Sequence, residues 1–203
     1  GDHRDLHSFP TRRSSDLVGS VTYDRPGLRL NGALTVGWAK SQFEALGGYA
    51  DRSFLIMQPT TADERWRFVL SGIADLPFDF TFSTVAIFAA PRPYVGTTGT
   101  DDNKNNNFND DFIGGPGNRI IRPNASWENM YRTVDVRLAR HFQLGTGQKF
   151  SLSLEAFNVF NWDNISSWGG RRADAAGNPI ANFGQPTGYY APRQAQLGIR
   201  YEF

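Results

Sequence analysis

Histidine and cysteine, the residues that most often carry nucleophilic or acid–base chemistry, are scarce in this chain. Its 203 residues include no cysteine and three histidines, of which His3 and His7 lie close to the start. The lack of cysteine excludes thiol catalysis, disulfide bonds and cysteine-ligated zinc. His141 alone cannot build a serine–histidine–aspartate triad, although lysine or carboxylate mechanisms stay open. We therefore expect no catalytic residue, no cofactor and no enzymatic activity.

The stretch DDNKNNNFNDD at 101–111 is the one concentrated run of oxygen-bearing side chains. Its alternate spacing is like that of a calcium-binding loop. The candidate ligands are Asp101, Asn103, Asn105 and Asn107. However, the central glycine and the closing glutamate of such a loop are absent. A solvated loop is therefore the favoured interpretation, and calcium binding is the weaker hypothesis.

Composition narrows the class of protein. The net charge is +1 and the basic residues are scattered, which argues against nucleic acid as a partner. Aromatic residues make up 14% of the chain and glycine occurs 21 times, which favours β structure. The longest apolar run, Val85 to Ala90, ends at Pro91, so we expect no transmembrane helix.

Residues 1–17, GDHRDLHSFPTRRSSDL, have no periodicity. They resemble the conceptual translation of the universal Illumina sequencing adapter, and a basic N-terminal arm is the alternative. On the first interpretation the segment is an artefact that should be disordered, because no selection has shaped it to pack. Residues 18–203 would then be the C-terminal part of a longer protein whose true N-terminus is missing.

Alternation of apolar and polar residues predicts six long strands and a partial seventh at 18–24. The six lie at 28–40, 66–76, 79–90, 132–142, 149–160 and 192–203. They exceed the ~5–6 residues of a typical soluble strand and match the ~9–11 residues of a tilted transmembrane strand. The connections alternate between tight turns and loops of about 25 residues or more, at 41–65, 91–131 and 161–191, which is typical of outer-membrane barrels.

Each predicted strand has one apolar face, on which Arg140 is the only charged residue that we expect. Charged residues otherwise fall on the opposite face: Arg29, Arg67, Asp75, Asp79, Asp135, Arg137, Glu155, Arg200 and Glu202. Aromatic residues gather near the strand ends, as in the two interfacial girdles of a barrel. A soluble sandwich would show the same asymmetry of faces. The length of the strands and the alternation of short and long loops are therefore what distinguish a membrane barrel from a soluble sandwich.

Four stretches in order carry a family resemblance: RFVLSGIADLPF (67–78), RTVDVRLARHFQL (132–144), SLSLEAFNVFNWDN (151–164) and APRQAQLGIRYEF (191–203). They resemble the last strands of TonB-dependent outer-membrane receptors, and most closely the Oar-like group, whose members usually begin with a carboxypeptidase-regulatory-like domain. The FNVFN of 157–161 is similar to the NLFN or NLFD signature on that family's penultimate strand.

The resemblance implies an all-β fold: an antiparallel meander over 18–203 that forms the C-terminal segment, six or seven strands, of a large transmembrane β-barrel. It implies import of an unidentified substrate across the bacterial cell outer membrane, with a TonB complex acting through a region upstream. The partners would be outer-membrane lipid and the barrel-assembly machinery. That machinery would read the final alternation, Leu197, Ile199, Tyr201 and Phe203.

Two other classes of function stay open. A passive porin or a surface adhesin would share the barrel but would lack a plug domain and a TonB-contacting segment. A soluble β-sandwich binding module or hydrolase would dissolve without detergent.

Overall fold

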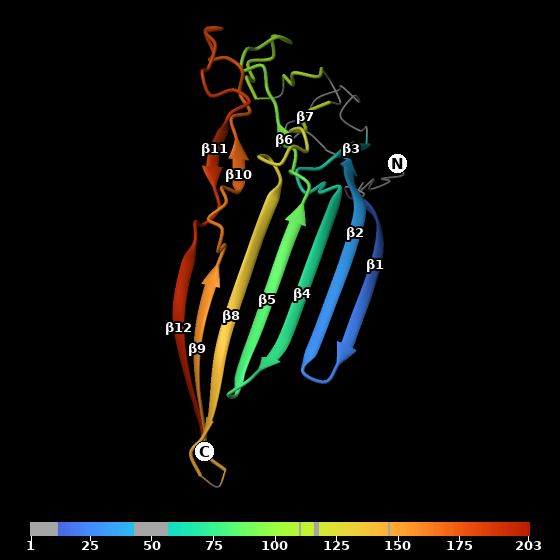
Figure 1. The fold of residues 1–203 in the computed structure, drawn as a ribbon. Helices are drawn as coiled ribbons and strands as arrows, with labels where there is room; N and C mark the ends of the chain where they lie inside the picture. The colour runs from blue at the N-terminus through green and yellow to red at the C-terminus, as the bar shows by residue number, and fades with distance from the viewer. Residues whose placement is uncertain (1–11, 43–56, 110, 116–117, 146) are drawn as a thin grey trace, which may run out of the picture.

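The fold, seen in a computed structural model that describes residues 12–42, 57–109, 111–115, 118–145 and 147–203, is one large antiparallel sheet (Figure 1). Seven strands follow each other as neighbours in the order β1-β2-β4-β5-β8-β9-β12, and β3 (Met57–Pro59) pairs with β2. The seven are β1 (Arg12–Arg25), β2 (Leu28–Gln42), β4 (Trp66–Leu76), β5 (Phe80–Ala89), β8 (Tyr131–Gln143), β9 (Lys149–Phe157) and β12 (Gln194–Glu202). The predicted all-β antiparallel meander is confirmed. The sheet is open, since in the described residues β1 pairs only with β2 and β12 only with β9.

The first strand is longer than the sequence predicts. Instead of a partial strand at 18–24, pairing with β2 runs from Arg12, opposite Ser41, to Arg25, opposite Leu28. The expectation that 1–17 lack structure is therefore wrong for 12–17, while 1–11 lie outside the described residues. The physical reason is that the free edge of β2 offers unpaired backbone groups to any extended chain, whatever its side chains.

Short turns lie at one end of the sheet and long connections at the other (Figure 1). The turn between β4 and β5 is tight, and Phe78 and Asp79 adopt φ of 64° and 60° there. The long connections carry two small sheets, β6 (Tyr94–Val95) with β7 (Ile120–Ile121) and β10 (Ile165–Trp168) with β11 (Pro186–Tyr189). The predicted alternation of short and long connections is confirmed.

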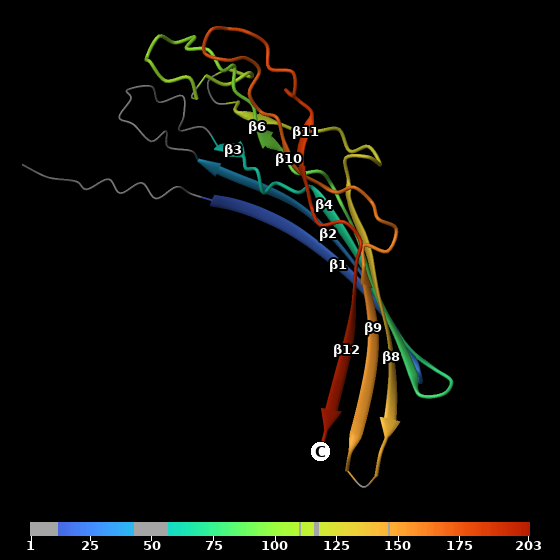
Figure 2. The same cartoon turned by 90° about the vertical axis from the view of Figure 1, so that its left-hand side faces the viewer.

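One face of the sheet is apolar and uncovered. A single row across six strands contains Leu28, Ala74, Phe82, Leu138, Leu154 and Leu197. Leu154 is 52% exposed and Leu197 is 75% exposed. The only hydrophobic residues buried in the described part are alanines: Ala89, Ala90, Ala139 and Ala173. Figure 2 shows the long strands as one curved layer, and no second sheet formed by the described residues lies against it. Within the described part of the chain, this face therefore has no second layer to pack against.

The apolar face carries charged residues beyond the one predicted: Arg25, which lies opposite Leu28, and Lys40 and Arg132 share it with Arg140. Arg132 pairs with Phe88 at the loop end of the sheet, and Arg140 pairs with Phe80 at the turn end. Arg132 is 8% exposed, with its guanidinium carbon 4.5 Å from the centre of the Trp127 ring. Arg140 lies 5.1 Å from the Phe80 ring centre. Arg132 and Arg140 are thus held by aromatic faces near the strand ends, the arrangement that suits a cation at a membrane interface.

The opposite face is polar, and some of its charges are paired across strands. Arg137 on β8 contacts Glu155 on β9 at 2.9 Å, and Gln196 on β12 donates to the same carboxylate at 2.7 Å. These three residues lie in one register row. Because the pairs are exposed, each contributes only about 0–1 kcal/mol to stability. They show that this face is built to meet water or polar groups.

An uncovered apolar face has a direct consequence for the isolated chain. We expect the chain expressed alone to form inclusion bodies and to dissolve in detergent but not in plain buffer, because contiguous apolar patches of this kind associate in water. Light scattering and size-exclusion chromatography with and without detergent measure this. A monodisperse monomer in plain buffer that unfolds cooperatively would contradict the membrane interpretation.

Candidate functional site

A pocket of about 560 Å³ lies where the polar face meets the long connections. Arg67 and Tyr131 enter it from the sheet, both in the row that includes Ala89. The remaining walls come from residues 61–64, 90–95 and 165–170 together with Asn129 and Tyr190. Its volume is within the range of ~300–1,000 Å³ that small-molecule sites occupy.

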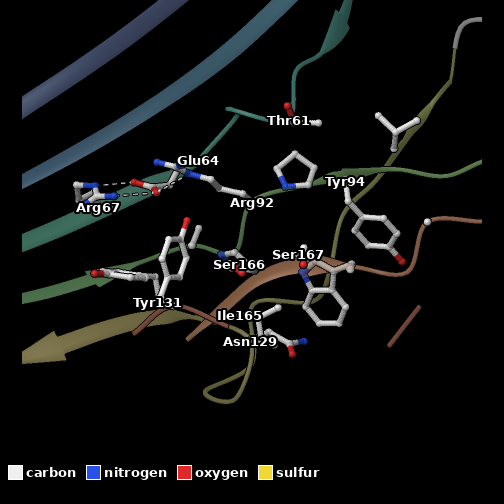
Figure 3. Close-up of a pocket in the computed structure, with 17 residues that line it drawn as sticks. Thr61, Glu64, Arg67, Arg92, Tyr94, Asn129, Tyr131, Ile165, Ser166 and Ser167 are labelled. Carbon is white, nitrogen blue, oxygen red and sulfur yellow. Dashed lines mark hydrogen bonds and ion pairs between the residues drawn. The ribbon is translucent and has the colours of Figure 1, made fainter. Parts of the chain in front are cut away.

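A charged cluster forms one side of the pocket (Figure 3). Glu64 accepts two hydrogen bonds from Arg67, from Nε to Oε1 at 2.7 Å and from Nη2 to Oε2 at 3.0 Å. Arg92 reaches the same carboxylate through Nε at 3.3 Å, and its side chain is 54% exposed. The cluster holds two positive charges and one negative charge. Arg67 is committed to Glu64, whereas Arg92 keeps its terminal nitrogens for another partner.

Aromatic rings line other parts of the pocket. Tyr94 and Trp168 stack with ring centres 5.8 Å apart and planes 13° apart, and Tyr131 meets Tyr190 edge to face at 5.6 Å. Burial raises the pKa of the Tyr94 phenol because desolvation disfavours the phenolate. Tyr94 therefore presents a neutral hydroxyl at physiological pH that can donate or accept a hydrogen bond.

Glycines allow the two loops that frame the pocket to touch. Thr97 N donates to Gly170 O at 2.8 Å, and Arg172 N donates to Thr97 O at 3.0 Å. A Cβ at Gly170 would lie 2.1 Å from Val95 O, and one at Gly99, whose φ is 84°, would lie 1.8 Å from Ala173 O. Any side chain at these positions would push the loops apart. The glycines thus fix the relative position of the aromatic and charged walls.

A buried carboxylate anchors the segment that carries Glu64. Asp63 is 0% exposed and accepts from Ala39 N at 2.8 Å and from Arg122 Nη2 at 2.6 Å. Arg65 contacts it at 3.3 Å. Two cations and a backbone amide satisfy this carboxylate, as a buried charge requires. Asp63 therefore ties the β2–β4 connection to both β2 and the β5–β8 connection.

In the FNVFN stretch and just after it, asparagine side chains form hydrogen bonds with backbone groups of neighbouring segments. Asn158 bonds Trp162 through both its amide groups, at 2.9 and 3.0 Å, and Asn161 accepts from Arg193 N at 2.9 Å. Asn164 accepts from Arg132 N at 2.7 Å and donates to Arg132 O at 2.8 Å. The side chain of Asn164 thus replaces a strand partner for β8. The three asparagines satisfy backbone groups where the regular pairing of β9 ends.

We expect Asn164→Ala to lower the free energy of unfolding by about 2 kcal/mol, because it leaves two buried backbone groups of Arg132 without partners. Asn164 is 3% exposed. Urea titration of the protein folded in lipid vesicles measures the effect. The neighbouring exposed residue gives a matched control, since Asp163→Ala should change stability by less than about 0.5 kcal/mol. Equal losses in the two variants would contradict this role of Asn164.

The Asp/Asn-rich loop uses its oxygens on its own backbone. Asp101 accepts from Asn105 N and Asn106 N, each at 2.9 Å. Asn103 accepts from Asn105 N at 3.1 Å, Asn105 from Asn107 N at 2.8 Å and Asn107 from Asn109 N at 3.1 Å. These successive Asx turns explain the alternate spacing without an ion. The described residues hold no group of three or more His, Cys, Asp or Glu side chains that could bind a metal, and calcium binding stays a prediction.

The four residues of the predicted assembly signal lie on one side of β12 or just after it. Leu197, Ile199 and Tyr201 pair with the apolar-face residues of β9, and the Tyr201 and Phe203 rings stack at 6.1 Å. Phe203 is 99% exposed. Their role in assembly stays a prediction. His141 lies on the polar face, where its Nδ1 is 2.9 Å from Ser151 Oγ.

Comparison with known proteins found no matching family model and no matching curated protein. Among the described residues, no helix is long and apolar enough to cross a membrane.

The sequence did not indicate the pocket. Its residues come from five separate stretches and have no common spacing, so only the folded connections bring them together. Arg67 was the one lining residue that the sequence placed on the polar face. The clusters of Pro, Arg and aromatic residues at 91–94 could have drawn attention to that loop.

Proposed function

We propose that this chain forms part of the wall of an outer-membrane β-barrel of a TonB-dependent receptor that imports a substrate. The observation that carries the proposal is the single-layer sheet whose apolar face is exposed across seven strands. A soluble sandwich would cover that face with a second sheet about 10 Å away. Lipid is the other environment in which such a face is stable.

The dimensions of the sheet support the proposal. The seven strands have 9 to 15 residues. At ~3.3 Å per residue and a tilt of ~40°, ten residues rise about 25 Å, the height of the apolar band of an outer-membrane barrel. The cations on the apolar face avoid the middle of this band: Arg132 and Arg140 lie near opposite ends of β8, Arg25 ends β1, and Lys40 lies near the end of β2.

The open edges support a larger closed assembly. In the described residues, β1 and β12 each present one side without a paired strand. Within a bilayer an unpaired backbone group costs several kcal/mol, so both edges would need partner strands. In the proposed receptor, further barrel strands would supply these partners, and a plug and the TonB contact would lie in regions outside this chain.

Cysteine labelling on intact cells tests the orientation. The chain has no cysteine, so a single variant carries the one thiol of this chain, and any cysteine elsewhere in the full receptor is replaced by serine. We expect an impermeant maleimide to label Asn103→Cys in the β5–β8 connection and to leave Gln148→Cys in the β8–β9 turn unlabelled until the membrane is opened. Labelling of Gln148→Cys alone would invert the orientation, and equal labelling of both in a cytosolic fraction would contradict the membrane role.

Energised uptake separates an importer from a passive barrel. If the proposal is right, uptake of the bound substrate stops when the proton-motive force is dissipated, although binding at the cell surface remains. A barrel that passes its solute at the same rate under both conditions would be a porin.

A further inference from the structure

The pocket between the polar face and the long connections is lined by both charged and aromatic side chains. Its charged side and its aromatic side face a common space, and Ser166 and Ser167 lie between the labelled charged residues and Tyr94 (Figure 3). This combination of flat apolar walls and a few converging polar groups is the usual composition of a small-molecule site. The pocket therefore indicates the chemistry of a ligand.

The charges of the pocket favour a ligand with one negative charge. Glu64 neutralises Arg67 through two hydrogen bonds and contacts Arg92 through one at 3.3 Å. One positive charge remains, and it is concentrated on the exposed end of Arg92. A carboxylate matches the planar fork of a guanidinium in two parallel hydrogen bonds. A multiply charged anion would be repelled by the nearby Glu64 carboxylate.

The walls of the pocket favour a ligand whose ring has an apolar face and carries hydroxyl groups. The half-buried Tyr94 and Trp168 rings stack with nearly parallel planes and line the pocket with aromatic surface. The hydroxyls of Thr61, Ser166 and Tyr94 line the same space. A purely apolar ligand would leave these groups and Arg92 without hydrogen-bond partners, which costs free energy on burial. A saccharide offers an apolar ring face for the aromatic pair and hydroxyls for the polar groups.

We propose that this pocket binds a short acidic saccharide, with its carboxylate on Arg92 and a sugar ring on the Tyr94–Trp168 pair. This inference rests on the proposed function, because the receptor would take such a ligand from outside the cell. It names the substrate class of that receptor. A peptide with a terminal carboxylate is the competing class of ligand.

Binding to the detergent-solubilised receptor tests the proposal. The probes are a glucuronate-containing disaccharide, its neutral methyl ester and an acidic dipeptide, each followed by tryptophan fluorescence and calorimetry. We expect the acid to bind at least about tenfold more tightly than the ester, as one charge-assisted hydrogen-bonded pair provides. Arg92→Gln should remove this preference and leave affinity for the ester unchanged, while Tyr94→Ala should weaken both sugars.

A control variant and an independent assay of barrel assembly distinguish failure of the saccharide proposal from failure of the barrel proposal. Arg172 is an exposed loop arginine outside the pocket, so Arg172→Gln should bind both sugars as the unaltered receptor does. Heat-modifiable mobility of every variant verifies barrel assembly independently. Assembled receptor that binds neither sugar, or binds the dipeptide more tightly than the acid, would overturn the saccharide assignment and leave the barrel proposal intact. Unchanged acid preference in Arg92→Gln would overturn the assigned role of Arg92.

Discussion

Replacing Arg122 by methionine is expected to lower the free energy of unfolding by about 3 kcal/mol, because it leaves the Asp63 carboxylate buried with one cation fewer. Asp63 is 0% exposed, and its shortest contact is the 2.6 Å hydrogen bond from Arg122 Nη2. Arg65 at 3.3 Å and Ala39 N remain as partners, which places the effect at the low end of the ~3–5 kcal/mol that breaking a buried ion pair costs. Urea unfolding in lipid vesicles measures the loss.

A double substitution makes this prediction specific. Asp63→Asn removes the buried charge, so the Asp63→Asn, Arg122→Met protein should recover part of the stability that Arg122→Met alone loses. Arg172→Met, at an exposed loop position, should change stability by less than about 0.5 kcal/mol. If Arg122→Met is as mild as Arg172→Met, the carboxylate is not held as the structure indicates.

Replacing Leu70 by arginine is expected to cost about 2–4 kcal/mol in a bilayer, because the charge would lie near the middle of the lipid-facing band. Leu70 is 41% exposed on the apolar face, between Gly32 and Ala86 in the middle of β4. Its neighbour Ser71 faces the other side, opposite Asn31 and Val85. Ser71→Arg, at the same depth on the polar face, should cost much less.

The cost of an arginine on the apolar face should depend on its position along the strand if that face meets lipid. Leu76→Arg lies at the turn end of β4, and there the cost should fall to about 0–1 kcal/mol. All three variants can be compared by urea titration in the same vesicles. The barrel interpretation requires the cost of arginine on the apolar face to fall from the middle of the strand to its end. Equal losses in Leu70→Arg and Leu76→Arg would therefore contradict it.

The strands could be predicted because their signal is local. Alternation within β4, β5, β8, β9 and β12 specifies one face of each, and the observed register places those faces on the same side. The observed end of a strand differs from the predicted one where a side chain outside the alternating pattern turns the backbone. The strand predicted at 149–160 ends at Phe157, because Asn158, with φ of 49°, turns the chain and bonds Trp162.

The remaining features depend on contacts between distant residues. Asp63 meets Arg122 across 59 positions of sequence, and Asn164 meets Arg132 across 32. Neither pair has a spacing that the sequence alone could reveal. Arg132 was missed on the apolar face because a buried cation there is stable only beside Trp127 and Trp162, which come from two different connections. Residues 12–17 pair with β2 although their sequence has no alternation of apolar and polar residues.

Spin labels on β4 test most directly whether the apolar face of the sheet meets lipid. The chain has no cysteine of its own, so single cysteine variants at 68 to 74 can be labelled in a membrane-embedded receptor whose other cysteines, if any, are replaced by serine. Collision rates with oxygen, which concentrates in lipid, and with a water-soluble nickel chelate then report the surroundings of each position. We expect positions 68, 70, 72 and 74 to meet oxygen and positions 69, 71 and 73 to meet the chelate or neither reagent. Shielding of the even positions from both reagents would show a protein core against this face and would contradict the account.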